Sequence, residues 1–336
     1  MQITLGRTGI TVNKNGFGAL PVQRRTMAES QQILRAAFDA GINYFDTARS
    51  YTDSEEKLGR ALCDVRKKII IATKTHSANV KDFNTHLETS LNLLKTDYID
   101  IYQFHNPANY PRPDDGIGLY EAALKAKQDG KIRFIGLTNH RLHTAREGIE
   151  SGLYDTLQFP FSYISGEKEE ALISLCEEKN VGFIAMKALC GGLLNDIDSA
   201  CAWMNTQKSV LPIWGIQHLS EVSALVNATK NTSPNAEQTK RIEKDRKELK
   251  GDFCRSCGYC MPCPHNIQIH NCARMSFLLR RSPQAQWLTQ DWQNEMAKIK
   301  ECEHCDACKK KCPYGLDTPA LLEKNYKDYL TFLPNV

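Results

Sequence analysis

Apolar residues follow a regular pattern from residue 16 to about residue 230. Short apolar runs that suit strands alternate with longer segments in which apolar residues recur every three or four positions, as on one face of a helix. Each run and the helical segment after it span roughly 30 residues, the size of one βα unit. The eight runs begin near Gly16, Ile42, Ile69, Ile99, Ile132, Thr156, Val181 and Leu211.

The segments between the runs carry recognisable helix signals. Between Phe83 and Leu94, large apolar residues fall at i, i+4, i+8 and i+11, which predicts one buried helical face. The helix after the second run starts with Asp53-x-x-Glu56, which resembles a capping box. Eight alternations with short connections favour a (β/α)8 barrel, also called a TIM barrel, over an open sheet. Residues 1–15 are expected to form a hairpin that closes the bottom of this barrel.

The composition changes after the eighth unit. Residues 231–250 are polar and charged, and they are interpreted as a partly helical linker. Residues 251–320 hold nine of the cysteines, and 321–336 form a tail that is expected to begin as a helix. The sequence therefore predicts a barrel over 1–230, a charged linker, a small cysteine-rich domain and a tail.

Length and charge exclude several classes of protein. At 336 residues, the chain has room for one large domain and one small domain. A net charge of +4 at pH 7 is too small for a dedicated nucleic-acid-binding protein. The N-terminus lacks signal-peptide features, and no apolar run reaches the roughly 18 residues of a membrane helix. We therefore expect a cytoplasmic protein without nucleic-acid or membrane partners, and metal binding is the first candidate explanation for its 13 cysteines, since disulfides are rare in that compartment.

Polar residues close three of the predicted strands. Asp46, Lys74 and His105 end the second, third and fourth runs, and Tyr51 lies in the loop after Asp46. In a barrel, such positions lie at the mouth, where catalytic groups gather. Together with the letters SEEKLG shortly after the tyrosine, these four residues resemble the catalytic tetrad of the aldo/keto reductases.

This resemblance implies a role for each of the four residues. Tyr51 would give a proton to the oxygen of a substrate carbonyl, and the ammonium of Lys74 would lower the pKa of the tyrosine. Asp46 would hold Lys74 by an ion pair, and His105 would orient the substrate oxygen. The substrate would then be an aldehyde or a ketone, or an alcohol in the reverse direction.

The same resemblance implies a nicotinamide dinucleotide site without a Rossmann glycine motif. Polar groups would surround the carboxamide, an aromatic ring would stack on the nicotinamide, and a Gly-Gly pair would approach the pyrophosphate. NADP-selective relatives often carry Lys or Arg after the eighth strand, where this chain has Gln217 and His218, so both NADP and NAD are candidates. The implied residues are Thr138, Asn139, Gln158, Phe161, Gly191, Gly192, Leu193, Gly215, Gln217, Glu221 and Asn227.

Two cysteine-rich runs in the C-terminal part resemble a ferredoxin module. The run from Cys302 to Cys312 has the bacterial ferredoxin spacing, in which the fourth cysteine binds the other cluster. The run from Cys254 to Cys263 is one residue shorter between its last two cysteines. The ferredoxin pattern implies two [4Fe-4S] clusters, one held by Cys254, Cys257, Cys260 and Cys312 and the other by Cys302, Cys305, Cys308 and Cys263.

Alternatives stay open for these cysteines. The short spacing makes Cys272 a substitute candidate for Cys263, and paired Cys-x-x-Cys motifs also suit zinc. The clusters could pass electrons or could staple a domain that has few apolar residues. The run Lys309–Lys311 is ordinarily a solvated face, and it could also dock an acidic electron-carrier protein. The other cysteines are interpreted as small buried apolar groups: Cys63, Cys176, Cys190 and Cys201.

The sequence thus predicts an NAD(P)H-dependent carbonyl reductase that carries two [4Fe-4S] clusters. A protein of another class is the alternative: an iron–sulfur electron-transfer or redox-sensing protein built on an aldo/keto reductase scaffold. The presence of all four residues of the tetrad favours the enzyme.

Overall fold

The computed structural model describes residues 1–333, which form parts of two compact units. One unit combines residues 1–188 with 197–240, and the other combines residues 189–196 with the chain from residue 241 onward. The short segment 189–196 therefore groups with the C-terminal unit, although its neighbours in the chain belong to the first. The last three residues of the predicted tail, 334–336, lie outside the described residues.

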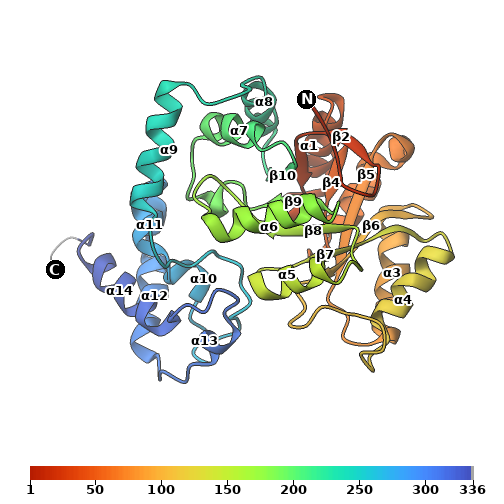
Figure 1. Ribbon diagram of the computed structural model, residues 1–336. Coiled ribbons are helices and arrows are strands. Elements are labelled where there is room, and N and C mark those ends of the chain that lie inside the picture. Colours follow the sequence, from red (N-terminus) through yellow and green to blue (C-terminus); the bar gives the residue numbers. More distant parts are fainter. Residues whose placement is uncertain (334–336) are drawn as a thin grey trace. The chain divides into compact units, whose positions relative to one another are not determined.

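A closed barrel of eight parallel strands forms the first unit (Figure 1). The predicted (β/α)8 barrel is confirmed, and each strand begins within two residues of its apolar run. The barrel closes because the last strand pairs in parallel with the first. The strands are β3 (Gly16–Gly18), β4 (Tyr44–Asp46), β5 (Ile70–Thr75), β6 (Ile99–His105), β7 (Ile132–Thr138), β8 (Thr156–Pro160), β9 (Gly182–Met186) and β10 (Val210–Gly215).

One helix follows each of these strands. The apolar positions predicted for the third helix are all buried in the structure. Short 3₁₀ turns η1 (Leu20–Arg24), η2 (Cys63–Lys68) and η3 (Cys190–Gly192) add to the connections. The helices are α1 (Met27–Asp39), α2 (Ser54–Leu62), α3 (Val80–Leu94), α4 (Leu119–Gln128), α5 (Leu142–Glu150), α6 (Glu167–Glu178), α7 (Ile197–Thr206) and α8 (Leu219–Ala228).

The predicted capping box at the start of α2 is wrong. Asp53 occupies the N-cap position but accepts no capping hydrogen bond through its side chain. Its carboxylate pairs instead with Lys57 at 2.9 Å, and Glu56 pairs with Arg60 at 2.7 Å. Both acidic residues therefore pair with a cation one turn later, a favourable i,i+4 arrangement on a helix.

The barrel interior changes from apolar to polar toward the C-terminal ends of its strands. The N-terminal hairpin, β1 (Gln2–Thr4) and β2 (Thr11–Asn13), pairs antiparallel, and its buried Ile3 and Val12 join the apolar cluster that includes Ile101. Successive inward positions on a strand are two residues apart. On β6, Ile101 is therefore followed on the same face by Gln103 and His105, so the strand delivers polar groups to the barrel mouth.

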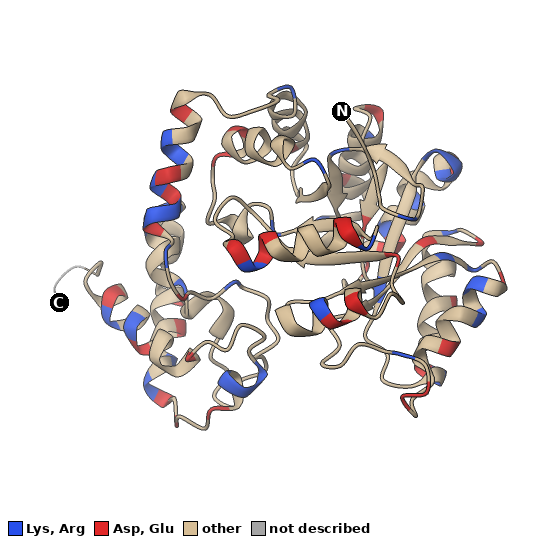
Figure 2. Cartoon of the chain, in the orientation of Figure 1, with Lys and Arg blue, Asp and Glu red and all other residues tan. Residues whose placement is uncertain are grey.

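The second unit is mostly helical and carries the cysteine runs. Helix α14 begins three residues before the predicted tail, and the helix predicted in the linker is present as α9, in which residues of both charge signs are distributed along the axis (Figure 2). Among the described residues, no helix is long and apolar enough to cross a membrane. The elements are α9 (Ala236–Glu248), α10 (Ile269–Cys272), α11 (Met275–Arg281), η4 (Gln284–Trp287), α12 (Gln290–Ala297), η5 (Lys298–Glu301), α13 (Ala307–Lys311) and α14 (Thr318–Leu330).

Candidate functional site

A buried ion pair lies at the ends of two neighbouring strands. The Nζ atom of Lys74, on β5, donates to Oδ1 of Asp46, on β4, at 2.6 Å and to the carbonyl of Thr47 at 2.7 Å. Both charged side chains are almost fully buried. Burial raises the pKa of Asp46 and lowers that of Lys74, while the attraction between the two charges opposes both changes. A buried pair of this kind is costly to break and holds each partner in one geometry.

Tyr51 lies beside this ion pair. The Lys74 ammonium is 5.2 Å from the centre of the tyrosine ring. Burial, and then the negative charge of Asp46, raise the pKa of Tyr51 above its ordinary value. The predicted lowering of this pKa by Lys74 is therefore wrong, because desolvation of the phenolate dominates. At neutral pH the hydroxyl consequently keeps its proton, as a proton donor must.

His105 completes this cluster from the end of β6. Its ring meets that of Tyr51 edge-on, with the centroids 5.9 Å apart, and that of His76 at 3.9 Å. Burial, followed by the charge of Lys74, lowers the pKa of His105 well below its ordinary value. The imidazole is therefore neutral at pH 7. Its Nδ1 atom is buried without a hydrogen-bond partner among residues 1–333, which leaves a polar group for a ligand to satisfy.

A network of side-chain amides surrounds the Asp46 carboxylate. Gln103 and Gln158 each donate to it at 3.3 Å, and Thr138 donates to the carbonyl oxygen of Gln103 at 2.8 Å. The sequence analysis did not include Gln103. The available signal was its position two residues before His105 on the same strand face. Gln103 thus connects the Asp46 carboxylate to Thr138, one of the residues expected around the nicotinamide.

The residues expected around the nicotinamide lie at the ends of β7 and β8. Thr138 pairs with Gln158 in the register of the two strands, and both side chains are buried. The Oε1 atom of Gln158 has no partner within the described part of the chain. Asn139 is bonded locally, since its amide donates to the carbonyl of Pro107 at 2.9 Å. Phe161 is 1% exposed, so its ring is embedded in side chains and not open to solvent.

The Gly-Gly pair expected near the pyrophosphate lies in the segment 189–196 of the second unit. Gly191 and Gly192 have φ values of +64° and +86°, which favour glycine. A Cβ atom on Gly191 would come within 3.1 Å of the guanidinium of Arg274. Leu193 is fully buried. This loop is thus shaped by side chains of the C-terminal unit.

The other residues expected at the cofactor site lie at the end of β10 and along the segment that follows it. Gly215 ends the strand, and the carboxylate of Glu221 accepts from the backbone N–H groups of Gln217 at 2.7 Å and His218 at 3.0 Å, which caps α8. Asn227 is exposed in the last turn of α8 and accepts from a lysine there. Glu221 and Asn227 therefore lie near opposite ends of one helix.

The structure adds a cation that the sequence analysis missed. Nη2 of Arg25 lies 3.4 Å from Nε2 of His218. Arg25 directly follows η1, which follows β3, and β3 pairs with β10 when the barrel closes. The two residues are 193 positions apart, so no local pattern could have associated them. The Nε atom of Arg25 is buried without a partner in the described chain.

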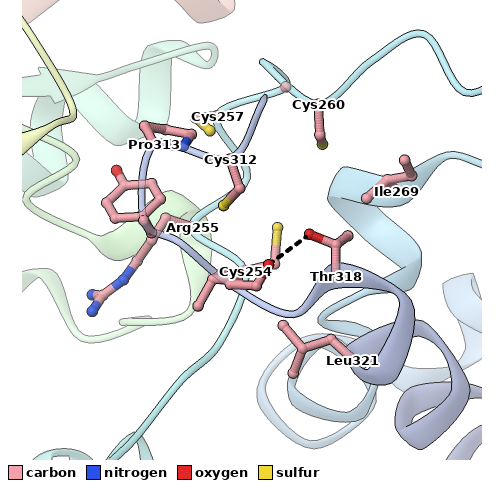
Figure 3. Close-up of a pocket in the computed structure, with 12 residues that line it drawn as sticks. Cys254, Arg255, Cys257, Cys260, Ile269, Cys312, Pro313, Thr318 and Leu321 are labelled. Carbon is pink, nitrogen blue, oxygen red and sulfur yellow. Dashed lines mark hydrogen bonds between the residues drawn. The ribbon is translucent and has the colours of Figure 1, made fainter. Parts of the chain in front are cut away.

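Four cysteines surround one cavity in the second unit (Figure 3). Cys254, Cys257, Cys260 and Cys312 all line it, with apolar side chains such as Ile269 and Leu321. The backbone N–H of Ser256 donates to the sulfur of Cys254 at 3.4 Å. Four thiols around an otherwise largely apolar cavity are a donor set that fits a [4Fe-4S] cluster.

A second cavity has the complementary set of cysteines. Cys302, Cys305 and Cys308 line it together with Cys263, and Cys260 lies on its wall as well. Cys272 is absent from the lining of both cavities and is fully buried in α10. Burial raises its pKa to about 12, which keeps the thiol protonated. Despite the short spacing, the chain brings Cys263 to the second set.

None of the 13 cysteines, all of which lie within the described residues, forms a disulfide. Outside the two cavities, Cys176, Cys190 and Cys201 are buried as expected, but Cys63 is exposed, so the expectation for Cys63 is wrong. It is the first residue of η2, directly after α2, where the chain turns along the surface. The run Lys309–Lys311 is exposed on α13 (Figure 2), and Lys309 pairs with Asp317 at 2.8 Å.

Comparison with protein families gives two matches along the chain. Residues 14–207 match the model of the aldo/keto reductase family. Residues 253–317 match the model of a 4Fe-4S dicluster domain. The two predicted signatures, in the barrel and in the cysteine runs, are therefore both supported by whole-segment similarity.

Individual relatives resemble the barrel part. The chain is 30% identical over 213 residues to the aldo-keto reductase YhdN of Bacillus subtilis, and the match covers 57% of this chain and 62% of that protein. It is 32% identical over 212 residues to an L-galactose dehydrogenase of Arabidopsis thaliana, with 57% of this chain and 66% of that protein covered. The chain thus spans less than two thirds of the length of these relatives.

Solved structures share the fold. An aldo-keto reductase from Bacillus halodurans in its holo form has a TM-score of 0.62 at 24% identity, with 73% of this chain and 95% of that chain covered. An aldo-keto reductase from Klebsiella pneumoniae in complex with NADPH has a TM-score of 0.62 at 23% identity, covering 72% and 94%. At such identities the similarity establishes the barrel architecture.

Proposed function

Because the chain belongs to the aldo/keto reductase family, we propose that it is an oxidoreductase that reduces an aldehyde or ketone to an alcohol with NAD(P)H, and that it carries two [4Fe-4S] clusters. The ion pair between Lys74 and Asp46 at 2.6 Å, beside Tyr51 and His105, is the observation that carries this proposal. A reduced nicotinamide supplies hydride to the carbonyl carbon, so the protein has to supply one proton to the oxygen.

Tyr51 is the proposed proton donor. Its raised pKa keeps the hydroxyl protonated in the resting protein, and the nearby Lys74 ammonium stabilises the negative charge that develops as the proton leaves. Asp46 holds this ammonium in place. His105 is neutral, so one ring nitrogen can donate to the substrate oxygen without competing for the proton. Together these groups polarise the carbonyl and leave a neutral alcohol.

Arg25 favours NADP as the cofactor. A 2′-phosphate needs fixed positive charge, and an arginine is protonated at every physiological pH. Gln217 and His218 do not meet this need by themselves, whereas Arg25 beside His218 does. In the proposed site, Thr138, Asn139, Gln158 and Phe161 surround the nicotinamide, the loop from Gly191 to Leu193 approaches the pyrophosphate, and Gly215, Gln217, Glu221 and Asn227 belong to the segment that completes the site.

Each proposed cluster has its own cysteine set. Cys254, Cys257, Cys260 and Cys312 would hold the first cluster, and Cys302, Cys305, Cys308 and Cys263 would hold the second. The two cavities that these cysteines line support this assignment. A [4Fe-4S] cluster supplies single electrons or a structural cross-link. An acidic electron carrier is a partner that fits the exposed Lys309–Lys311.

The remaining proposals concern the extent and location of the protein. We assign the barrel to residues 1–230, the linker to 231–250, the cluster domain to 251–320 and the tail to 321–336. A cytoplasmic location agrees with 13 cysteines that form no disulfides, since such a compartment keeps thiols reduced.

The replacement Tyr51→Phe tests the catalytic proposal. The variant keeps the aromatic ring and loses the transferable proton, so carbonyl reduction should fall by about 10²–10⁴-fold. Binding of NADPH should be retained, because no proposed dinucleotide contact is removed. The measurement is steady-state oxidation of NADPH with a panel of aldehydes and ketones, using anaerobically purified protein, together with NADPH binding by fluorescence.

Tyr98→Phe is the matched control. Tyr98 comes directly before β6, at the opposite end of the strand from His105, so its hydroxyl is remote from the proposed chemistry. We expect wild-type turnover from this variant. Wild-type turnover from Tyr51→Phe would contradict the assignment of the proton donor.

A further inference from the structure

The loop Leu189–Asp196 is held by arginines of the C-terminal unit. Arg281, at the end of α11, donates to the carbonyl of Leu193 at 3.1 Å, and Asn195 donates to the carbonyl of Arg281 at 3.0 Å. Arg274, just before α11, donates through Nη2 to the carbonyl of Gly191 at 2.9 Å. The connection between β9 and α7, a barrel connection by sequence, is therefore fixed by the cluster-bearing unit.

Arg274 and Arg281 differ in how their charges are neutralised. Arg281 pairs with Asp245 at 2.8 Å and also with Glu248. Arg274 has no salt bridge among the described residues and is 6% exposed, and its Nε and Nη1 atoms are buried without hydrogen-bond partners there. Buried guanidinium groups ordinarily have a counter-charge and acceptors for their protons. Something else must supply both for Arg274.

Two cysteines, one of them in the first set, act as negative charges on Arg274. Burial lowers the pKa of Arg274, and Cys254 and then Cys190 act against this lowering. Ser256 also lies near both Cys254 and the loop. Its backbone N–H donates to the sulfur of Cys254 at 3.4 Å. Its Cβ lies 3.8 Å from the position that a Cβ on Gly191 would occupy. The loop thus lies close to both Arg274 and Ser256, and Ser256 is bonded to Cys254, one of the proposed ligands of the first cluster.

We propose that Arg274 is a positioning residue that links the first cluster to the dinucleotide loop. One guanidinium binds the carbonyl of Gly191, and its positive charge would stabilise the cluster that Cys254 would help to hold. Both links rest on the proposed function: the link to the loop rests on the proposed NAD(P)H site, and the link to the cluster rests on the proposed [4Fe-4S] ligands.

Two measurable effects follow from one shared guanidinium. A cation close to a cluster favours the reduced form, which carries one more negative charge, so it raises the reduction potential. The same side chain holds the backbone of Gly191, so its loss releases the loop that would approach the pyrophosphate. Coupling of two sites through one group is reciprocal, and affinity changes of about tenfold are typical.

The test compares three arginine variants. In Arg274→Gln, one of the two reduction steps should move to lower potential, and NADPH should bind about tenfold more weakly. In Arg281→Gln, NADPH should also bind more weakly, but neither reduction step should move, because the charge of Arg281 is paired with carboxylates. Arg280→Gln changes an exposed arginine of the same helix that pairs with Asp328 and should alter neither quantity. Potentials are measured by anaerobic redox titration with electron paramagnetic resonance, and affinities by fluorescence.

Arg274→Lys distinguishes the loss of the positive charge from a general loss of folding. It keeps the charge and loses the fork geometry, so the potential should stay near the wild-type value while NADPH affinity falls. Wild-type potentials in Arg274→Gln protein with full iron content would overturn the link to the cluster, and unchanged NADPH affinity would overturn the link to the loop. Wild-type protein that binds NADPH but reduces no carbonyl would refute the proposed function and leave this inference in place.

Discussion

At the residue scale, the SEEKLG stretch after Tyr51 has a physical explanation. Glu55 is buried and accepts hydrogen bonds from Thr73 at 2.6 Å and from Ser90 at 2.7 Å. Thr73 precedes Lys74 on β5, so Glu55 fixes the strand that carries the lysine. A Cβ at Gly59 would lie 2.2 Å from the carbonyl oxygen of Leu93, so only glycine lets α2 approach α3 this closely. The motif therefore supports the proposed catalytic residues and has no proposed part in the chemistry itself.

Lys57 from the same stretch supports the candidate 2′-phosphate cation. Its ammonium is buried and donates to the carbonyls of Val22 at 3.0 Å and Arg25 at 2.6 Å. The backbone of Arg25 is therefore held in place from α2. The side chain of Arg25 is only weakly engaged, with Glu29 at 3.6 Å. It is thus free to bind a phosphate without breaking a strong ion pair.

We therefore predict that Arg25 determines the preference for NADPH over NADH. Arg25→Gln removes charge-assisted hydrogen bonds, each worth about 1.5–3 kcal/mol. The Kd for NADPH should consequently rise about tenfold or more, while the Kd for NADH stays unchanged. Both constants are measured by fluorescence titration.

Arg24→Gln serves as the control, because Arg24 is an exposed neighbour at the end of η1. We expect it to retain the NADPH affinity of the wild type within about twofold, the range of an exposed charge. An Arg25→Gln protein that binds both dinucleotides as the wild type does would show that the selecting cation lies elsewhere.

At the element scale, the features that could be predicted are those that follow from the spacing of apolar residues along the sequence. Strand starts, helix faces and the polar ends of β4, β5 and β6 follow from local patterns, so Asp46, Lys74 and His105 could be predicted together. Contacts between distant segments have no local signal. Arg25 reaches His218 through closure of the barrel, and the loop Leu189–Asp196 groups with a unit whose other residues lie far along the chain. Desolvation, which determines the pKa of Tyr51, also depends on packing that a sequence does not display.

The short first cysteine run yields a prediction at this scale. Cys263 lines the second cavity, whereas Cys272 is packed within α10. Cys263→Ser should therefore lower the iron content from about eight toward about four per chain, or convert the second cluster to a three-iron form. Cys272→Ser should keep about eight irons, although a buried hydroxyl will reduce the thermal stability.

Iron and sulfide analysis of anaerobically purified protein, with electron paramagnetic resonance, distinguishes the two variants. Full iron in Cys263→Ser combined with loss in Cys272→Ser would reverse the assignment of the fourth ligand. Stoichiometric zinc in place of iron would rule out clusters altogether.

At the scale of the whole molecule, the two units use electrons in different ways. Nicotinamide gives up two electrons together as hydride, whereas a [4Fe-4S] cluster accepts one electron at a time. Coupling the two ordinarily needs a flavin, which is not among the proposed cofactors. The link through Arg274 can shift a potential or an affinity, but it provides no one-electron step. The clusters are therefore expected to stabilise the second unit, because small domains often need a metal or another cross-link to fold stably. Alternatively, they serve a separate one-electron partner.

We accordingly predict that NADPH alone does not reduce the clusters within one catalytic turnover. In anaerobic stopped flow, oxidised protein mixed with NADPH should keep its visible cluster absorbance, whereas dithionite should bleach it. Tyr51→Phe protein should behave in the same way, because cluster reduction would not involve the proton donor. Bleaching by NADPH at the rate of turnover would show that electrons pass from the barrel to the clusters and would make this protein an electron-transfer enzyme. Unchanged absorbance, together with lost thermal stability on removal of iron, is the result expected for clusters that hold the second unit together.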